Sequence, residues 1–128
     1  MNTKQILESR ERAVKSAALA LDKKALDARI LAIGDLSSIA DYLVLATGRS
    51  DKQVQAIAES VRQGMKSFGN ALDIEGEKEG NWVVIDYGDV IVHVFQEEFR
   101  RRYDLDGLWS AAPEVEIPAE HRWEDKEP

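Results

Sequence analysis

The sequence predicts a single α/β domain of the α+β type, in which helices pack on a mixed, mainly five-stranded sheet. Three observations support this prediction. Residues 41–77 alternate strand, helix and strand patterns, as in a crossover unit that joins two parallel strands. Residues 82–95 hold two β-branched runs around a short glycine turn, which is typical of an antiparallel hairpin. Within the first of these segments, apolar residues recur at helical spacing over residues 54–68.

The N-terminal part predicts one helix and two strands. Asn2 and Gln5 have the spacing of a capping box, and a helix over about residues 3–25 follows. Its stripe is rich in alanine and contains Leu7, Val14, Ala18, Leu21 and Ala25. Residues 28–33 are predicted to form a strand. Residues 41–47 form a second one, whose apolar character on both faces is typical of a strand in the middle of a covered sheet.

The clearest predicted helix begins after Ser50. Ser50 and Gln53 have capping-box spacing, and Gly69 with Asn70 ends the helix. Its apolar face consists of Val54, Ile57, Ala58, Val61, Met65 and Phe68. A strand at about 72–77 completes a crossover unit, which we expect to be parallel and right-handed.

The C-terminal part predicts a hairpin, a short helix and a tail. The hairpin pairs residues 82–86 with residues 90–95, so the sheet is mixed. Residues 97–103 begin with acids and end with arginines, which matches the dipole of a short helix. We expect the folded domain to cover residues 1–112. The proline, alanine and glutamate content of residues 113–128 predicts an acidic, flexible tail.

Composition narrows the class of protein. The 128 residues suit one domain, and a hydrophobic content of 44% argues against disorder of the whole chain. The chain has no cysteine, which excludes disulfides, thiolate catalysis and cysteine-ligated zinc. No apolar run approaches the roughly 20 residues that span a bilayer, and the polar N-terminus does not resemble a signal peptide, so we expect a cytoplasmic protein. The net charge of −7 disfavours direct binding of nucleic acid and favours a basic partner.

Three candidate chemical sites have simpler explanations. Residues 48–50 precede a helix, but the glycines and the lysine of a phosphate loop are missing, so a plain strand-to-helix turn is favoured. Asp86 and Asp89 flank the hairpin turn, where aspartates commonly accept hydrogen bonds from local amides rather than hold a metal. His93 has no evident nucleophile or carboxylate partner, which favours a hydrogen-bonded, partly buried histidine. We therefore expect no catalytic residue, metal or cofactor.

Three large aromatic residues lie near the ends of the predicted hairpin and helix. Trp82, Tyr103 and Trp109 each carry a polar group on an apolar ring. Such residues serve both as core and as anchors of protein interfaces, and the residues alone leave both readings open. The arginines at 100–102 lie among acids, which favours a charge-balanced helix end over an RNA site.

Several motifs in order resemble the ribosomal silencing factor (Iojap-like) family over roughly residues 5–110. The matching segments are Asp35–Thr47, Gly48, Ser50, Gln53, Val54, Glu75–Glu77, Trp82, Asp86–Val90, Val92–Phe95, Arg102–Leu105 and Leu108–Trp109. Two positions depart from the family. Asp106 stands where a glutamate is common, and Gly107 stands where lysine or arginine is more usual, which we expect to soften the segment.

The resemblance implies a fold and a function. The implied fold is similar to nucleotidyltransferase domains. Family members bind the large ribosomal subunit through ribosomal protein fourteen and obstruct the joining of the small subunit, which lowers translation when nutrients are scarce. They are not regarded as catalytic, and they can form homodimers. No membrane or sequence-specific nucleic-acid partner is implied.

Carried onto this sequence, the resemblance implies structural roles for Asp89 and His93. It also implies a separate partner-binding surface. Its residues are Trp82, Asp86, Tyr103, Asp104, Leu105, Leu108 and Trp109. One alternative is an assembly factor of the large subunit that uses the same surface. A nucleotidyltransferase-like enzyme is a less favoured alternative, because no Asp-x-Asp or Asp-x-Glu pair follows Ser50.

Overall fold

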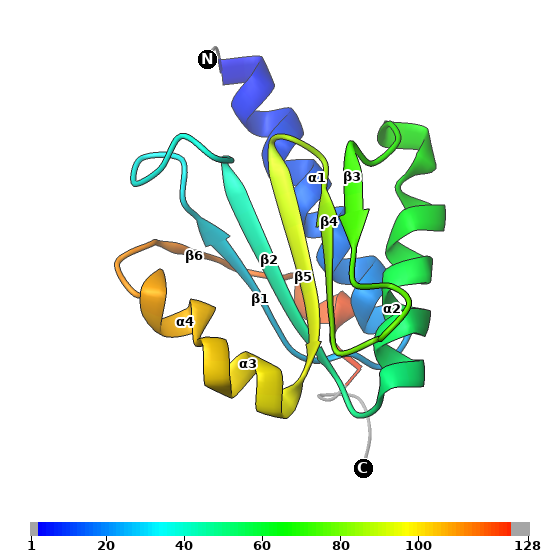
Figure 1. Cartoon of the computed structure of the whole chain (residues 1–128). Coiled ribbons are helices and arrows are strands. Elements are labelled where there is room, and N and C mark those ends of the chain that lie inside the picture. The colour runs from blue at the N-terminus through cyan, green and yellow to red at the C-terminus, as the bar shows by residue number, and fades with distance from the viewer. Residues whose placement is uncertain (1–2, 124–128) are drawn as a thin grey trace.

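The computed structural model describes residues 3–123, with side chains from Glu8 onward, and places helices on both faces of one mixed sheet (Figure 1). The helices are α1 (Thr3–Asp22), α2 (Asp51–Gly64), α3 (Glu97–Tyr103) and α4 (Leu105–Leu108), with short 3₁₀ helices η1 (Lys66–Phe68) and η2 (Ala119–His121). The strands are β1 (Leu26–Ala32), β2 (Tyr42–Gly48), β3 (Asp73–Glu75), β4 (Trp82–Asp86), β5 (Val90–Gln96) and β6 (Glu114–Val115). The predicted fold class is confirmed.

The sheet order is β3-β4-β5-β2-β1-β6, so within residues 3–123 the sheet has six strands and not the expected five. β2 pairs with β5 in parallel, and the other neighbours pair antiparallel. Every residue of β2 is buried, as its continuous apolar pattern predicts. The chain of pairings makes β3 parallel to β2, which confirms the parallel crossover through α2, with β4 and β5 lying between the two strands.

Two hydrophobic clusters lie on opposite faces of the sheet. The larger cluster is covered by α1 and α2, where alanines and a buried Ser16 on α1 let the helix approach the sheet closely. The Ser50 hydroxyl accepts a hydrogen bond from the Gln53 amide at 3.1 Å, which confirms the predicted cap of α2. The smaller cluster is covered by α3 and α4 and contains Leu31, Ile33, Ala40, Leu43, Leu45 and Phe95.

The expected flexible tail from residue 113 is wrong for residues 114–123. β6 pairs with β1, and Val115 and Ile117 are buried in the larger cluster. The Trp123 indole nitrogen donates to the Ala25 carbonyl oxygen at 2.9 Å. Val115 and Ile117 alternate with the exposed Glu114 and Glu116, which fits an edge strand with one buried face. Residues 124–128 of the expected tail lie outside the described residues.

A core role for the C-terminal segment predicts a large effect of truncating Ile117. Because this side chain is 2% exposed, Ile117→Ala should lower the free energy of unfolding by about 2 kcal/mol or more. Urea denaturation followed by tryptophan fluorescence measures the change. The neighbouring exposed residue gives a control, since Glu116→Ala should change stability by less than about 0.5 kcal/mol. Equal midpoints for the two variants would contradict this role.

Candidate docking surface

One face of the sheet is covered only in part. Along β4 and β5, buried residues face α1 and α2, whereas Trp82, Val84, Ile91 and His93 on the other face are half-buried. α3 begins directly after β5, and with α4 it covers the β1 and β2 side of this face (Figure 1). An open strip along β4 and β5 therefore lies beside the two helices, and this is the candidate docking surface.

An aromatic cluster connects this strip to α3. The Trp82 ring lies 4.9 Å from the Tyr103 ring, 5.6 Å from the Phe95 ring and 5.8 Å from the His93 ring, between centroids. The Trp82 indole N–H donates to His93 Nδ1 at 3.0 Å. Phe95 is fully buried and Trp82 half-buried, while Tyr103 is 51% exposed. Trp82 thus supports the face from within, and Tyr103 presents its ring to solvent.

His93 is hydrogen-bonded and partly buried, as its isolation in the sequence predicted. Burial lowers its pKa from the ordinary 6.5 to about 4, so the imidazole is neutral at pH 7. Nδ1 acts as an acceptor for Trp82, which places the ring proton on Nε2. A neutral imidazole holds the indole in position without adding a buried charge to the face.

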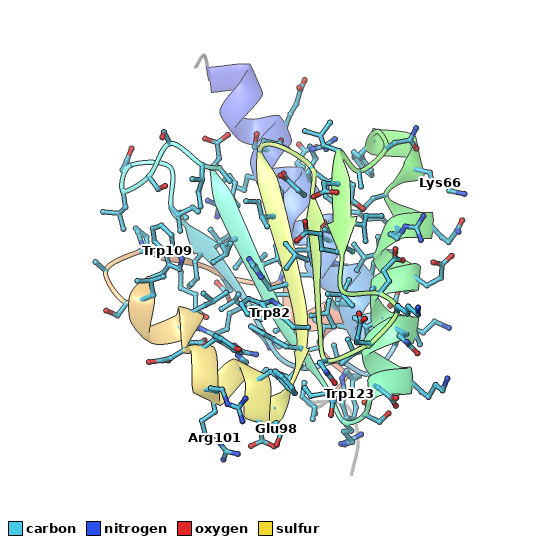
Figure 2. All side chains as sticks on the ribbon, in the orientation of Figure 1. Lys66, Trp82, Glu98, Arg101, Trp109 and Trp123 are labelled. Atoms are coloured by element: carbon cyan, nitrogen blue, oxygen red, sulfur yellow. The ribbon has the colours of Figure 1, made fainter. Side chains whose placement is uncertain are left out.

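The second exposed group on this face belongs to α4 and to the loop before β2. Leu108 is 70% exposed, and Trp109 is half-buried against the smaller cluster beside α4 (Figure 2). Ile33 and Ala40, at the two ends of the loop, belong to the same cluster, and the loop between them carries the exposed Leu36 and Ile39. The sequence prediction did not include these two loop residues, although apolar side chains between two predicted strands were a signal.

Asp104 sets the junction between α3 and α4. It adopts a left-handed conformation with φ of 46°, which an aspartate tolerates better than most residues. Its Oδ1 accepts a hydrogen bond from the Gly107 amide at 3.0 Å. A Cβ at position 107 would lie 2.2 Å from Asp104 Oδ2, so glycine leaves room for the capping carboxylate. Gly107 was expected to soften this segment, but the Asp104 cap holds the glycine in place.

A buried arginine holds α3 and α4 on the sheet. Arg100 Nε and Nη2 donate to the two carboxylate oxygens of Asp106, each at 2.9 Å. Arg100 Nη1 donates to Thr47 Oγ1 at 2.9 Å and to the Asp27 carbonyl at 2.6 Å. The hydrogen bonds from Arg100 are the main reason that the pKa of Asp106 falls to about 2. Arg100 is thus a structural cation, in line with the charge-balanced reading of the arginine run, whereas Arg101 points outward from α3 (Figure 2).

The structure brings together six of the seven residues expected at the partner surface. Trp82, Tyr103, Asp104, Leu105, Leu108 and Trp109 lie on or beside α3 and α4. Asp86 shares the face of Trp82 but lies at the other end of β4, about 13 Å away along a strand. Its Oδ1 accepts a hydrogen bond from the Gly88 amide at 2.8 Å, as expected for an aspartate at a hairpin turn.

Asp89, on the other side of the turn, is held by contacts with α1 rather than by the local amides that were expected. Asp89 accepts a hydrogen bond from the Ser9 hydroxyl at 2.8 Å and forms an ion pair with Arg12 at 3.1 Å. No group of three or more potential metal-binding side chains occurs among residues with described positions. In the same part of the chain, no helix has the length and apolar character needed to cross a membrane.

The lowered pKa of His93 predicts a dependence of stability on pH. Between pH 6.5 and about 4, the unfolded chain binds a proton at this residue that the folded chain does not. The free energy of unfolding should therefore fall by about 3 kcal/mol as the pH is lowered through this window. Urea titrations at pH 7, 5.5 and 4.5 measure the change.

The matched variant for this prediction is His93→Gln, whose amide oxygen can still accept from Trp82. The variant should lose most of the pH dependence between 6.5 and 4. Asp106, with a pKa near 2, contributes stability that is lost only as the pH falls below 3.8, so it does not obscure the test. The same pH profile in both proteins would show that another group is responsible.

Comparison with known proteins agrees with this geometry. The family model described as "Ribosomal silencing factor during starvation" matches residues 6–128. The ribosomal silencing factor RsfS of Bacillus subtilis (strain 168) is 40% identical, over 91% of this chain and 95% of that protein. The chloroplastic protein Iojap of Zea mays is 32% identical, over 83% of this chain and 46% of its own length.

Solved structures give the same result. A crystal structure of a Chromobacterium violaceum protein has a TM-score of 0.72 and 34% identity, covering 86% of this chain and 88% of its own. A Bacillus halodurans crystal structure has a TM-score of 0.67 and 35% identity, covering 91% of this chain and 100% of its own. The motifs, the mixed sheet and these matches together show that the chain belongs to the ribosomal silencing factor family.

Proposed function

We propose that this protein binds the large ribosomal subunit through ribosomal protein fourteen, blocks joining of the small subunit and so represses translation when nutrients are limiting. Membership of the ribosomal silencing factor family supports the ribosomal partner. The observation that carries the choice of surface is the half-open sheet face, where exposed Tyr103 and Leu108 flank the half-buried Trp82 and Trp109. Exposed aromatic and apolar side chains around a supported core are typical of protein interfaces.

Charge supports a basic partner. The chain carries a net charge of −7, and Glu97, Glu98 and Asp104 are exposed at the ends of α3 beside the aromatic cluster. Complementary charge raises the association rate and the specificity of a complex, while the buried apolar contacts supply most of the affinity. Arg101 and Arg102 are also exposed on α3, so the charge around the anchors is mixed. Ribosomal proteins are typically basic, and the acidic character that suits such a partner is that of the whole chain.

The proposal needs no catalysis. Blocking subunit joining requires only that the protein occupies a surface that the small subunit must reach. The groups that might have served chemistry are engaged elsewhere: Asp89 pairs with Arg12, and His93 accepts from Trp82. We therefore propose a non-enzymatic, cytoplasmic regulator.

The surface predicts weakened ribosome binding when its exposed anchors are truncated. Tyr103→Ala and Leu108→Ala should each weaken binding to isolated large subunits, by about 2 kcal/mol where the side chain is an anchor, since the truncated side chain no longer fills the partner's surface. Co-sedimentation through sucrose gradients with separated subunits, at two salt concentrations, measures the affinity. Light scattering of mixed subunits measures the block of joining, which should weaken in parallel.

Leu72→Ala is the matched control for Leu108→Ala. Leu72 is 74% exposed, close to the 70% of Leu108, but lies next to β3 at the edge of the sheet. This variant should sediment with large subunits as the wild type does. Folded Tyr103→Ala and Leu108→Ala proteins that bind normally would place the docking surface elsewhere, and a wild type that ignores large subunits would refute the function itself.

A further inference from the structure

An ion-pair network runs from Asp106 on α4, through Arg29 on β1, to Glu114 on β6 in the C-terminal segment. Arg29 Nη1 donates to Asp106 Oδ1 at 2.7 Å. Arg29 Nη2 and Nε donate to Glu114 Oε1 on β6, at 2.7 and 3.1 Å. The side chain of Arg29 thus lies between α4 on one side and the last strand on the other.

The irregular start of β1 lets two arginines reach one carboxylate. Asp27 adopts a left-handed conformation with φ of 49°, and the pairing register of β1 shifts between Leu26 and Arg29. Through this shift, the Asp27 carbonyl accepts from Arg100, while Arg29 donates to Asp106. Asp106 therefore receives Arg100 from α3 and Arg29 from the sheet.

Apart from the contact of Asp106 with Arg100, α4 depends on its two flanking segments for its direction. It spans four residues, far fewer than the roughly 12 that an isolated helix needs for stability. On its N-terminal side, the Asp104 cap connects it to α3. On its C-terminal side, the chain passes to Pro113, whose carbonyl accepts from the Ala32 amide at 2.8 Å, and to Glu114 opposite Leu31. The exposed Leu108 side chain is therefore held by contacts on both sides of α4.

We propose that Arg29 is a positioning residue for the docking surface, and that the C-terminal segment, through Glu114, sets the orientation of α4 and of Leu108. This inference rests on the proposed function, because it assigns a role in ribosome docking to residues that lie outside the expected contact set. It also gives the C-terminal segment a function beyond burying Val115 and Ile117.

A positioning role is separable from a role in global stability. The side chains of Arg29 and Glu114 are 35% and 47% exposed, and ion pairs at such positions contribute little to the free energy of unfolding. Arg100 is the buried cation of the network, and its bidentate contact with Asp106 does not involve Arg29, so we expect it to remain when Arg29 is replaced. Loss of Arg29 should therefore loosen α4 while the sheet and α3 remain folded.

Arg29→Gln and Glu114→Gln test the inference, with Arg62→Gln as the matched control. Arg62 is 37% exposed and also bridges two carboxylates, those of Glu59 and Glu77, on the α2 side of the molecule. Arg29→Gln and Glu114→Gln should each weaken binding to isolated large subunits by about three- to tenfold, with thermal midpoints close to that of the wild type. Arg62→Gln should leave the affinity unchanged.

Two further measurements show whether Arg29 acts through α4. In a Leu108→Ala background, Arg29→Gln should cause little additional loss of affinity, since the side chain that it positions is gone. Amide hydrogen exchange should become faster at Leu108 and Trp109, whose amides donate to Asp104 and Leu105, in Arg29→Gln but not in Arg62→Gln.

The outcomes separate the inference from the proposed function. Wild-type protein that fails to sediment with large subunits refutes the function. If the wild type binds, then unchanged affinity of Arg29→Gln, or a loss that is fully additive with Leu108→Ala, overturns the positioning role. Unchanged hydrogen exchange in Arg29→Gln overturns it as well, without any reference to the ribosome.

Discussion

The arrangement of the docking face depends on one constraint, the need to satisfy the buried guanidinium of Arg100. A buried cation is costly unless a carboxylate and further acceptors surround it. Asp106 on α4, Thr47 on β2 and the Asp27 carbonyl on β1 meet this need. The three acceptors must be in place together around Arg100. The Arg100–Asp106 ion pair therefore fixes how α3 and α4 cross the sheet. A buried ion pair is weak evidence for stability, and the Arg100–Asp106 pair instead specifies the positions of α3 and α4.

The position of α3 and α4 determines what stays open. Because the two helices cover the β1 and β2 side, the same face of β4 and β5 remains half-exposed. α1 and α2 fully cover the opposite face, where alanines on α1 allow close packing. One sheet therefore has a closed side that stabilises the fold and a half-open side that is available to a partner.

Local patterns predicted most of the fold, and long-range contacts account for what they missed. β2, the capped α2 and the β4–β5 hairpin are encoded within short stretches, by apolar continuity, a Ser50 cap and alternation. β6 was missed because its two residues form a strand only by pairing with β1, which is far away in the sequence, and Val115 gains its burial there. Arg29 was missed for the same reason, since its partners follow 77 and 85 positions later.

The sequence predicted which residues belong to the candidate docking surface. It did not predict which of them are exposed and which support the others. Alternation along β4 put Trp82 on the correct face, yet only the structure shows that its indole N–H is used by His93. Tyr103 is 51% exposed, and its ring packs against Trp82 in a tilted arrangement. In a complex, Tyr103 is therefore the aromatic residue of this pair that can both bury its ring and donate a hydrogen bond. Trp82 contributes by fixing that ring in place, so replacing it would act on the docking surface from beneath.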